Sequence, residues 1–179
     1  MKIGLMRHFK VDWTPANHWM TADEFDQWIV DYNHSNIIPD QTQVMDTDWN
    51  ICLSSDLIRA RDTANIVYSG DIQCLNLLRE IDIAPILRLR VRLHTNIWLA
   101  LGRLAWYFAH RSQLESRVQV TARAQHVIDL IESYQVDNVL VVSHGMFIKV
   151  LNKQLRVRGY EGPSVNVPRN GDLYTYEKL

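Results

Sequence analysis

Val139-Leu140-Val141-Val142-Ser143-His144-Gly145 is the stretch of this chain that decides its fold. The four apolar residues that open it predict a buried strand, and we expect a helix over 145–155 directly after it. His144 stands between the two, just past the carboxyl end of the strand. Open α/β sheets bind their ligands at this place. The stretch therefore predicts one strand of a parallel sheet with a functional histidine at its end.

The start of the chain repeats this arrangement. Residues 2–6 predict another strand, and Arg7 and His8 follow at its end in the run Leu5-Met6-Arg7-His8. Because both strands deliver a histidine to the same edge of the sheet, we expect the two imidazoles to share one pocket. The arginine beside them indicates that this pocket holds an anionic group, which the histidines handle chemically.

Strand and helix patterns alternate along the rest of the chain. Apolar runs predict strands at 51–53 and 72–78, and a closing edge strand at 172–177 after the turn signal Asn170-Gly171. Helices are expected after the capping box Thr21-Ala22-Asp23-Glu24, after the cap residues Ser54-Ser55-Asp56, and over 115–134. The last helix should bury a face that holds Val118, Ala122, Val127, Ile128 and Ile131. This alternation predicts an α/β fold, a single three-layer α/β/α domain over 1–179 with a mostly parallel, doubly wound sheet.

The composition is that of an ordinary soluble globular protein. Of 179 residues, 47% are hydrophobic and 22% are charged, which allows a sizeable core without disulfides. The net charge of −1 argues against nucleic acid as a partner. Cys52 and Cys74 lie in apolar runs, so we expect two buried, reduced thiols. A strand in place of a signal peptide at the start, and no apolar stretch of spanning length, predict a cytoplasmic protein without membrane contact.

A third strand end adds another cation to the expected pocket. Arg59 falls in the first turn of the helix that follows Ser54-Ser55-Asp56. A cation there faces the positive end of the helix dipole, which is unfavourable unless an anion shares the site. Taken alone, Arg59 fits a solvent-exposed arginine paired with Asp56 or Asp62 better than a ligand-binding one. Its place at a strand end, like that of both histidines, favours the anion pocket.

Three segments together resemble the signature of the histidine phosphatase superfamily, also called the phosphoglycerate-mutase-like family. They are Leu5-Met6-Arg7-His8, Ser54-Ser55-Asp56-Leu57-Ile58-Arg59-Ala60-Arg61-Asp62-Thr63-Ala64 and Val142-Ser143-His144-Gly145. The resemblance implies a phosphomonoesterase that acts on a phosphorylated small molecule or protein side chain through a phosphohistidine, with no metal and no other cofactor. It implies that His8 is the nucleophile and that Arg7, Arg59 and His144 bind the phosphate. Leu78-Arg79-Glu80 is similar to the family's Leu-x-Glu segment, which carries the proton donor.

Elementary chemistry agrees with these roles. Neutral imidazole is a good nucleophile near pH 7, and its phosphorylated form is open to hydrolysis by water. The planar guanidinium groups of the arginines match the geometry of phosphate oxygens. A phosphate dianion near His144 favours the protonated form of this histidine. The Gly145 N–H, at the start of a helix, adds one more hydrogen-bond donor. Glu80 would protonate the leaving alkoxide and then accept a proton from water. Asp82 is the rival acid, because it shares the face of Glu80 if the strand continues.

Two features depart from the family pattern or extend it. Phe9 replaces the usual glycine after His8, so its ring either lines the pocket wall or simply packs in the core. The segment at about 86–113 is expected to form a small helical cap insert over the pocket. This segment contains Arg88, Arg90 and Arg92. These arginines either form a solvent-exposed basic face or attract an acidic substrate.

Three other functions compete with a phosphatase. A phosphoglycerate-mutase-type phosphotransferase is disfavoured because such members of the family are typically longer. A non-catalytic phosphate-binding or interaction module is disfavoured by the complete set of Arg7, His8, Arg59 and His144. A metal-dependent hydrolase is disfavoured because the remaining histidines lack ligand spacing. The expected partner is therefore a phosphorylated substrate, and the sequence leaves the oligomeric state open.

Overall fold

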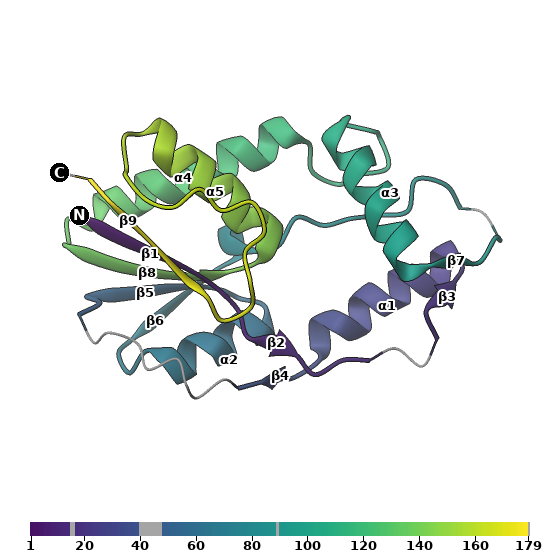
Figure 1. The fold of residues 1–179 in the computed structure, drawn as a ribbon, viewed down its shortest axis with the longest axis horizontal. Coiled ribbons are helices and arrows are strands. Elements are labelled where there is room, and N and C mark those ends of the chain that lie inside the picture. The colour runs from purple at the N-terminus through teal and green to yellow at the C-terminus, as the bar shows by residue number, and fades with distance from the viewer. Residues whose placement is uncertain (15–16, 40–47, 89, 179) are drawn as a thin grey trace.

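A central five-stranded sheet organises the computed structural model, which describes residues 1–14, 17–39, 48–88 and 90–178 (Figure 1). The strand order is β6-β5-β8-β1-β9. The first four strands pair in parallel, and β9 runs antiparallel to β1 at the edge. The bounds are β1 Lys2–Arg7, β5 Ile51–Ser55, β6 Ile72–Leu75, β8 Asn138–Ser143 and β9 Leu173–Glu177. The predicted parallel sheet and its closing edge strand are confirmed.

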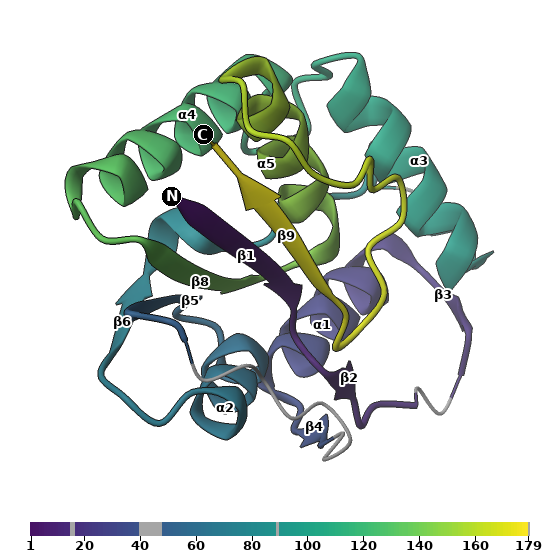
Figure 2. The same ribbon diagram turned by 60° about the vertical axis from the view of Figure 1, so that its left-hand side comes forward.

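Helices cover both faces of this sheet. Helix α2 (Ile58–Val67) lies on one face, and α4 (Arg117–Ser133) and α5 (Gly145–Val157) lie together on the other, as Figure 2 shows. The helices that connect the parallel strands thus cover apolar faces of the sheet that would otherwise be exposed to water. The three-layer α/β/α architecture predicted from the alternating pattern is confirmed.

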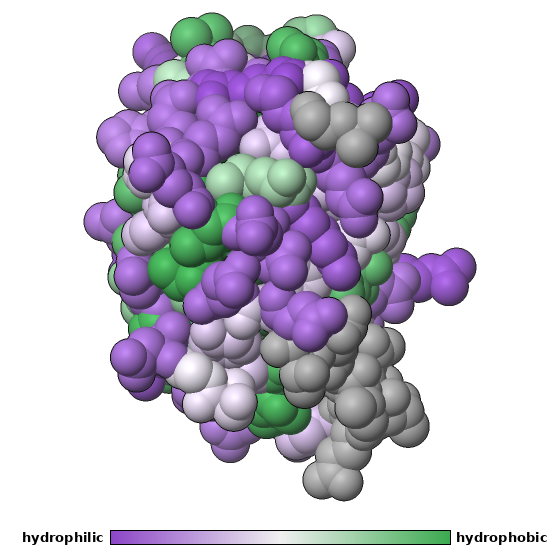
Figure 3. All heavy atoms as spheres, turned by 90° about the vertical axis from the view of Figure 1, so that its left-hand side faces the viewer, coloured by the Kyte–Doolittle hydropathy of each residue, from purple (hydrophilic) through white to green (hydrophobic). Residues whose placement is uncertain are grey.

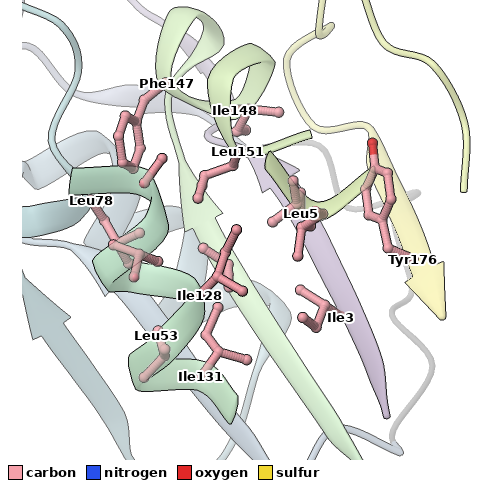
Figure 4. Close-up of a cluster of buried hydrophobic side chains, with 14 of the residues drawn as sticks. Ile3, Leu5, Leu53, Leu78, Ile128, Ile131, Phe147, Ile148, Leu151 and Tyr176 are labelled. Atoms are coloured by element: carbon pink, nitrogen blue, oxygen red, sulfur yellow. The ribbon is translucent and has the colours of Figure 1, made fainter. Parts of the chain in front are cut away.

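The main core lies between the sheet and the α4–α5 layer (Figure 4). Leu5 on β1 meets Leu151 on α5 and Ile128 on α4 within one cluster of fully buried side chains. The buried face of α4 is formed by Val120, Ala124, Val127, Ile128 and Ile131. The expectation that Val118 and Ala122 share this face is wrong, because both are exposed. The apolar stripe keeps a spacing of three and four residues only from Val120 onward.

Helix starts follow the predicted capping chemistry in one case and depart from it in another. Thr21 and Glu24 form a complete capping box at the start of α1 (Ala22–His34). In α2, by contrast, the N-cap is Leu57, and no side chain caps the helix. Ser54 and Ser55 remain within β5, where the Ser55 hydroxyl accepts the Leu57 N–H at 3.3 Å. The prediction that Ser54-Ser55-Asp56 caps α2 is therefore wrong.

A second group of elements lies beyond the carboxyl ends of the parallel strands (Figure 1). It contains α1, α3 (Thr95–Tyr107) and two small antiparallel sheets. One sheet pairs β2 (Lys10–Val11) with β4 (Ile37–Ile38), and the other pairs β3 (Trp19–Met20) with β7 (Leu93–His94). Met20, Phe25 and Trp98 form its apolar centre. The segment at 86–113 thus supplies α3 and β7, while α1 and β3 come from an earlier part of the chain.

Two of the three arginines singled out at the start of this segment, Arg88 and Arg92, bind within this group. Arg88 forms ion pairs with Asp23 and Asp26, and Arg92 donates to the Trp19 carbonyl and lies 3.3 Å from Glu24. These pairs are exposed, so each contributes little free energy. The ion pairs nevertheless engage the guanidinium groups of Arg88 and Arg92 with carboxylates near the start of α1. Arg90 is exposed.

The surface corrects one further prediction. Both cysteines are free, but only Cys52 is buried, whereas Cys74 on the edge strand β6 is exposed. Figure 3 shows the end of the molecule where both termini lie, and this face is mostly hydrophilic with small hydrophobic patches. Within the described residues, no helix combines the length and the apolar character needed to cross a membrane.

We expect Gly102→Ala in α3 to destabilise the protein, although alanine is the better helix former by about 1 kcal/mol. A Cβ at this buried position would overlap the Ile83 methyl Cγ2. A β-branched side chain has little freedom to turn away, so the cost should be about 1–3 kcal/mol. Urea unfolding measures it.

The matched control is the same substitution in an Ile83→Ala background. Without the methyl group in its way, Gly102→Ala should be neutral or stabilising there. Equal destabilisation in both backgrounds would contradict the proposed clash.

Candidate active site

Parallel pairing of β1 with β8 brings the predicted site residues together. Arg7 lies opposite Ser143 in the register, and the His8 backbone N–H donates to the Ser143 carbonyl at 3.0 Å. The His8 and His144 rings consequently lie with centroids 5.1 Å apart. Strand β5 pairs with β8 on its other side, and the helix after β5 delivers Arg59. The Arg59 Nε–H donates to His8 Nε2 at 3.3 Å.

Arg7 completes the group from the other side. Its guanidinium lies against Gly145, where a Cβ would be only 3.3 Å from Arg7 Cζ and Nε. Glycine at this position therefore permits the close approach. Arg7 also donates to the Pro168 carbonyl at 2.8 Å. The structure thus gathers Arg7, His8, Arg59 and His144, with the start of α5 beside them.

The two nitrogens of His8 have different partners. Nδ1 lies 2.6 Å from the Phe9 carbonyl oxygen, which can only accept, so Nδ1 carries the hydrogen. The lone pair of the neutral ring is then on Nε2, where the Arg59 Nε–H donates to it. The arrangement fixes one tautomer and turns Nε2 toward Arg59. A neutral imidazole of this kind can act as a nucleophile through Nε2.

Two residues that the sequence analysis missed hold the loop after β1 in place. Asn170 donates through Nδ2 to the carbonyls of His8 at 2.9 Å and Phe9 at 3.3 Å. The Thr63 hydroxyl accepts the Phe9 N–H at 2.9 Å and donates to the Arg59 carbonyl at 2.7 Å. In the sequence, Asn170 stands out only as part of a turn, and Thr63 only within a segment that resembles a family signature.

Phe9 itself is part of the core. It is 1% exposed and packs in a cluster with Met6, Trp49 and Val142. Of the two interpretations of this departure from glycine, the structure shows core packing. The backbone at Phe9 does not have a positive φ, so the larger side chain is accommodated without strain there.

Helix α1 anchors Arg59, and the sequence analysis did not foresee this. Arg59 is 2% exposed, and its NH1 donates to Asn33 Oδ1 at 2.9 Å. The guanidinium also lies over the Tyr32 ring, 5.1 Å from the centroid. The alternative pairing with Asp56 is not formed, because Asp56 accepts two hydrogen bonds from Arg79. Arg59 therefore links α1 to the end of β1.

Burial sets the charge state of both histidines. It is the main cause that lowers the pKa of His8 to about 3, and the Arg59 guanidinium lowers it further, against the opposing effect of the Phe9 carbonyl. Burial, followed by the charge of Arg59, also holds the pKa of His144 well below its usual range. Both ring nitrogens of His144 are buried without a hydrogen-bond partner among the described residues. Both imidazoles are therefore neutral at pH 7 in this arrangement.

Glu80 lies at the amino terminus of α5. Its carboxylate accepts the N–H groups of Ile81 at 3.0 Å, Phe147 at 3.1 Å and Met146 at 3.3 Å. These contacts place it at the first turn of α5, close to Gly145 and at the positive end of the helix dipole. The carboxylate caps α5 in place of His144, whose side chain makes no cap bond.

The rival acid Asp82 does not share a strand with Glu80. Strand β6 ends at Leu75 and a 3₁₀ turn follows over Asn76–Leu78, so the predicted strand to residue 78 is too long. Asp82 is exposed, and its charge acts on both Arg59 and Arg79. Both carboxylates thus belong to the surroundings of the site, in different environments.

A groove of about 1270 Å³ opens beside this cluster. Arg7, Glu80 and Gly145 line its inner end, and it continues between α5, α3 and residues 164–168. His8, Arg59 and His144 lie buried next to it. Among the described residues, His, Cys, Asp and Glu side chains do not gather in groups of three that could hold a metal ion. The arrangement can bind an oxyanion between guanidinium groups and offer it a neutral imidazole.

Several solved structures with a similar fold are described as phosphatases. A proposed alpha-ribazole-5'-P phosphatase from Escherichia coli is 22% identical, with a TM-score of 0.56 over 87% of this chain and 79% of its own. Phosphoserine phosphatase from Entamoeba histolytica is 17% identical, with a TM-score of 0.61 over 97% and 89%. A mycobacterial glucosyl-3-phosphoglycerate phosphatase is 21% identical, with a TM-score of 0.64 over 97% and 88%.

Sequence comparison agrees with this likeness. No curated protein sequence matches the chain. The sequence model of the histidine phosphatase superfamily (branch 1) matches residues 41–176, which include Arg59, Glu80 and His144. Arg7 and His8 lie before the matched segment, and the pairing of β1 with β8 places them in the same cluster. On this match over most of its length, and on the shared fold, the chain belongs to branch 1 of the histidine phosphatase superfamily.

Proposed function

We propose that the protein is a metal-independent phosphomonoesterase that hydrolyses a phosphorylated small molecule or protein side chain through a phosphohistidine at His8. One observation carries this proposal. His8 is neutral, its Nδ1–H is bound to the Phe9 carbonyl, and its Nε2 faces Arg59 beside His144. Such a nitrogen is oriented for attack on a phosphorus atom that the arginines hold in place.

The first step transfers the phosphoryl group to the protein. The substrate phosphate binds to Arg7 and Arg59, and Nε2 is released from the Arg59 Nε–H. Nε2 then attacks phosphorus, the ester P–O bond breaks, and the leaving oxygen takes a proton from the acid. The phosphate dianion raises the affinity of His144 for a proton, so His144 becomes a donor to a phosphoryl oxygen. This gives its two unpartnered nitrogens a purpose.

The second step restores the protein. A water molecule attacks the phosphohistidine, its proton passes to the carboxylate that served as the acid, and the N–P bond breaks. Inorganic phosphate leaves, and His8 returns to its neutral form. The low pKa of His8, about 3, makes the unprotonated ring available again at neutral pH.

Glu80 is the proposed proton donor. It lines the groove next to Arg7 and Gly145, where the leaving group of a phosphate bound at the cluster emerges. Its three N–H contacts hold the carboxyl in one place, which general acid catalysis requires. Asp82 has the charge of Arg59 nearby and is the alternative donor.

Replacement of the nucleophile should abolish turnover. We expect His8→Ala to lower kcat/KM for p-nitrophenyl phosphate by at least ~10³-fold, because no other group can form the covalent intermediate. Labelled substrate, quenched in alkali, should leave phosphohistidine on wild type and none on the variant. His126→Ala, at an exposed position of α4, is the matched control and should keep full activity, as should wild type in EDTA. Near-normal turnover by His8→Ala would refute the proposal.

The proton donor can be identified from its dependence on the leaving group. Glu80→Gln keeps one of the two oxygens that accept the Met146 and Phe147 N–H groups, but it cannot protonate an alkoxide. We expect it to slow alkyl phosphates by about 10²-fold or more and p-nitrophenyl phosphate much less, because p-nitrophenolate needs little protonation. Asp82→Asn should affect both substrates weakly. The reverse pattern would assign the role to Asp82.

Neutral buried histidines make stability depend on pH. In the unfolded chain a histidine takes up a proton below about pH 6.5, whereas native His8 resists protonation down to about pH 3 and His144 also has a lowered pKa. The free energy of unfolding should therefore fall as the pH falls from 6.5 to 4, by up to about 1.4 kcal/mol per pH unit for each histidine.

Urea unfolding at several pH values tests this slope. Carboxylates with lowered pKa values also lose stabilisation in acid, so the comparison is with the His8→Asn/His144→Asn variant. Its slope should be clearly shallower than that of wild type. Equal slopes would show that the two imidazoles are not held neutral by the fold.

A further inference from the structure

The groove beside the cluster is lined mainly by positively charged side chains, although the chain as a whole is nearly neutral. The sequence contains 19 Lys and Arg against 20 Asp and Glu. Among the described residues, one carboxylate lines the groove, Glu80, and it accepts three backbone N–H groups. The cations that line it are Arg7, Arg103, Arg117, Lys149, Lys153 and Arg156. A cleft with one sign of charge concentrates ligands of the opposite sign.

Helix α5 arranges three of these cations in a row. Lys149, Lys153 and Arg156 are spaced by four and three residues, so they lie on one face of the helix, and all three are exposed. With a rise of 1.5 Å per residue, Lys149 lies about 6 Å and Arg156 about 16 Å along the axis from Gly145. The row therefore leads away from the proposed phosphate site along the groove.

Several cations elsewhere in the described residues form ion pairs with carboxylates, and these three do not. Arg88, Arg123 and Arg158 form ion pairs with carboxylates. Within the part of the chain that the structure describes, Lys149, Lys153 and Arg156 have no carboxylate partner. Like charges four residues apart on a helix are mildly destabilising. An anionic ligand along this face would offset that repulsion.

The opposite side of the groove supports an extended ligand. Arg103 of α3 adds charge there, while exposed Leu104 and Tyr107 of the same helix add apolar surface. The volume of about 1270 Å³ is larger than the 300–1,000 Å³ that is usual for a small-molecule pocket. The space therefore fits a leaving group that continues well beyond the scissile phosphate.

We infer that the substrate is a phosphomonoester whose leaving group carries at least one more anionic group, which binds to Lys149, Lys153 and Arg156. This inference rests on the proposed function. The second anion, a phosphate or a carboxylate, would lie about 6–16 Å from the scissile phosphate along α5. It keeps the same contacts before and during phosphoryl transfer, so it lowers KM and leaves kcat nearly unchanged.

Two matched substrate pairs test the inference and separate the sources of the second anion. One pair is a hexose monophosphate and the corresponding hexose bisphosphate. The other is a phosphoserine peptide with neutral flanks and the same peptide with acidic flanks. We expect the more anionic member of at least one pair to have a kcat/KM at least tenfold higher, through KM, with the advantage shrinking as salt is added. Preference within one pair identifies that source, and equal kcat/KM values within both pairs overturn the inference.

A charge reversal then locates the effect. Lys153→Glu should reduce the preference for the anionic member at least fivefold, and Lys178→Glu, an equal change in net charge at an exposed site outside the groove, should leave it unchanged. The same loss in both variants would overturn the assignment to α5. If wild type hydrolyses p-nitrophenyl phosphate and neither pair shows a preference, this inference alone fails. If wild type releases phosphate from no substrate, the proposed function fails, and the inference falls with it.

Discussion

One imidazole held between a carbonyl and a guanidinium is the interaction on which the rest of the site depends. His8 gives its Nδ1 hydrogen to Phe9 and receives a hydrogen bond at Nε2 from Arg59. This contact requires the end of β1 to meet the start of α2, and the sheet order brings them there through β8. It also requires α1, because Asn33 and Tyr32 hold the far side of the Arg59 guanidinium. The sheet and the elements beyond its strand ends are therefore joined at His8, the proposed nucleophile.

Residues at strand ends could be predicted from the sequence, because strand direction alone determines where they go. An apolar run followed by Arg-His or Ser-His places its polar residues at one edge of a parallel sheet, and the structure gathers them there. Asn33 could not be found in this way. It lies on an amphipathic helix whose contact with Arg59 depends on how α1 packs, and no local pattern encodes that packing. The cationic lining of the groove could not be predicted for the same reason, since Arg103 and Lys153 line the same groove only because of how α3 and α5 pack.

Predictions from local sequence are wrong where contacts with neighbouring elements outweigh the local preference. Ser54 and Ser55 are good cap residues, but pairing with β8 and β6 keeps them in the sheet, so α2 begins later. The apolar run to residue 78 is compatible with a strand, yet the Ser143 hydroxyl donates to the Leu78 carbonyl and the chain turns there. Cys74 belongs to an apolar run, but it is exposed on the edge strand β6. In each case neighbouring elements decide the outcome.

The hydrogen bond from Arg59 to Nε2 also gives this nitrogen a form of protection. While its lone pair is engaged, a passing alkylating agent or an activated acyl compound meets an occupied atom inside the protein. To expose it, a molecule must offer the guanidinium a better acceptor than imidazole, and oxyanions do so whereas uncharged electrophiles do not. In the proposed mechanism, the residue that binds the phosphate thereby also shields His8 from other electrophiles, and chemical selectivity precedes any recognition of the remainder of the substrate.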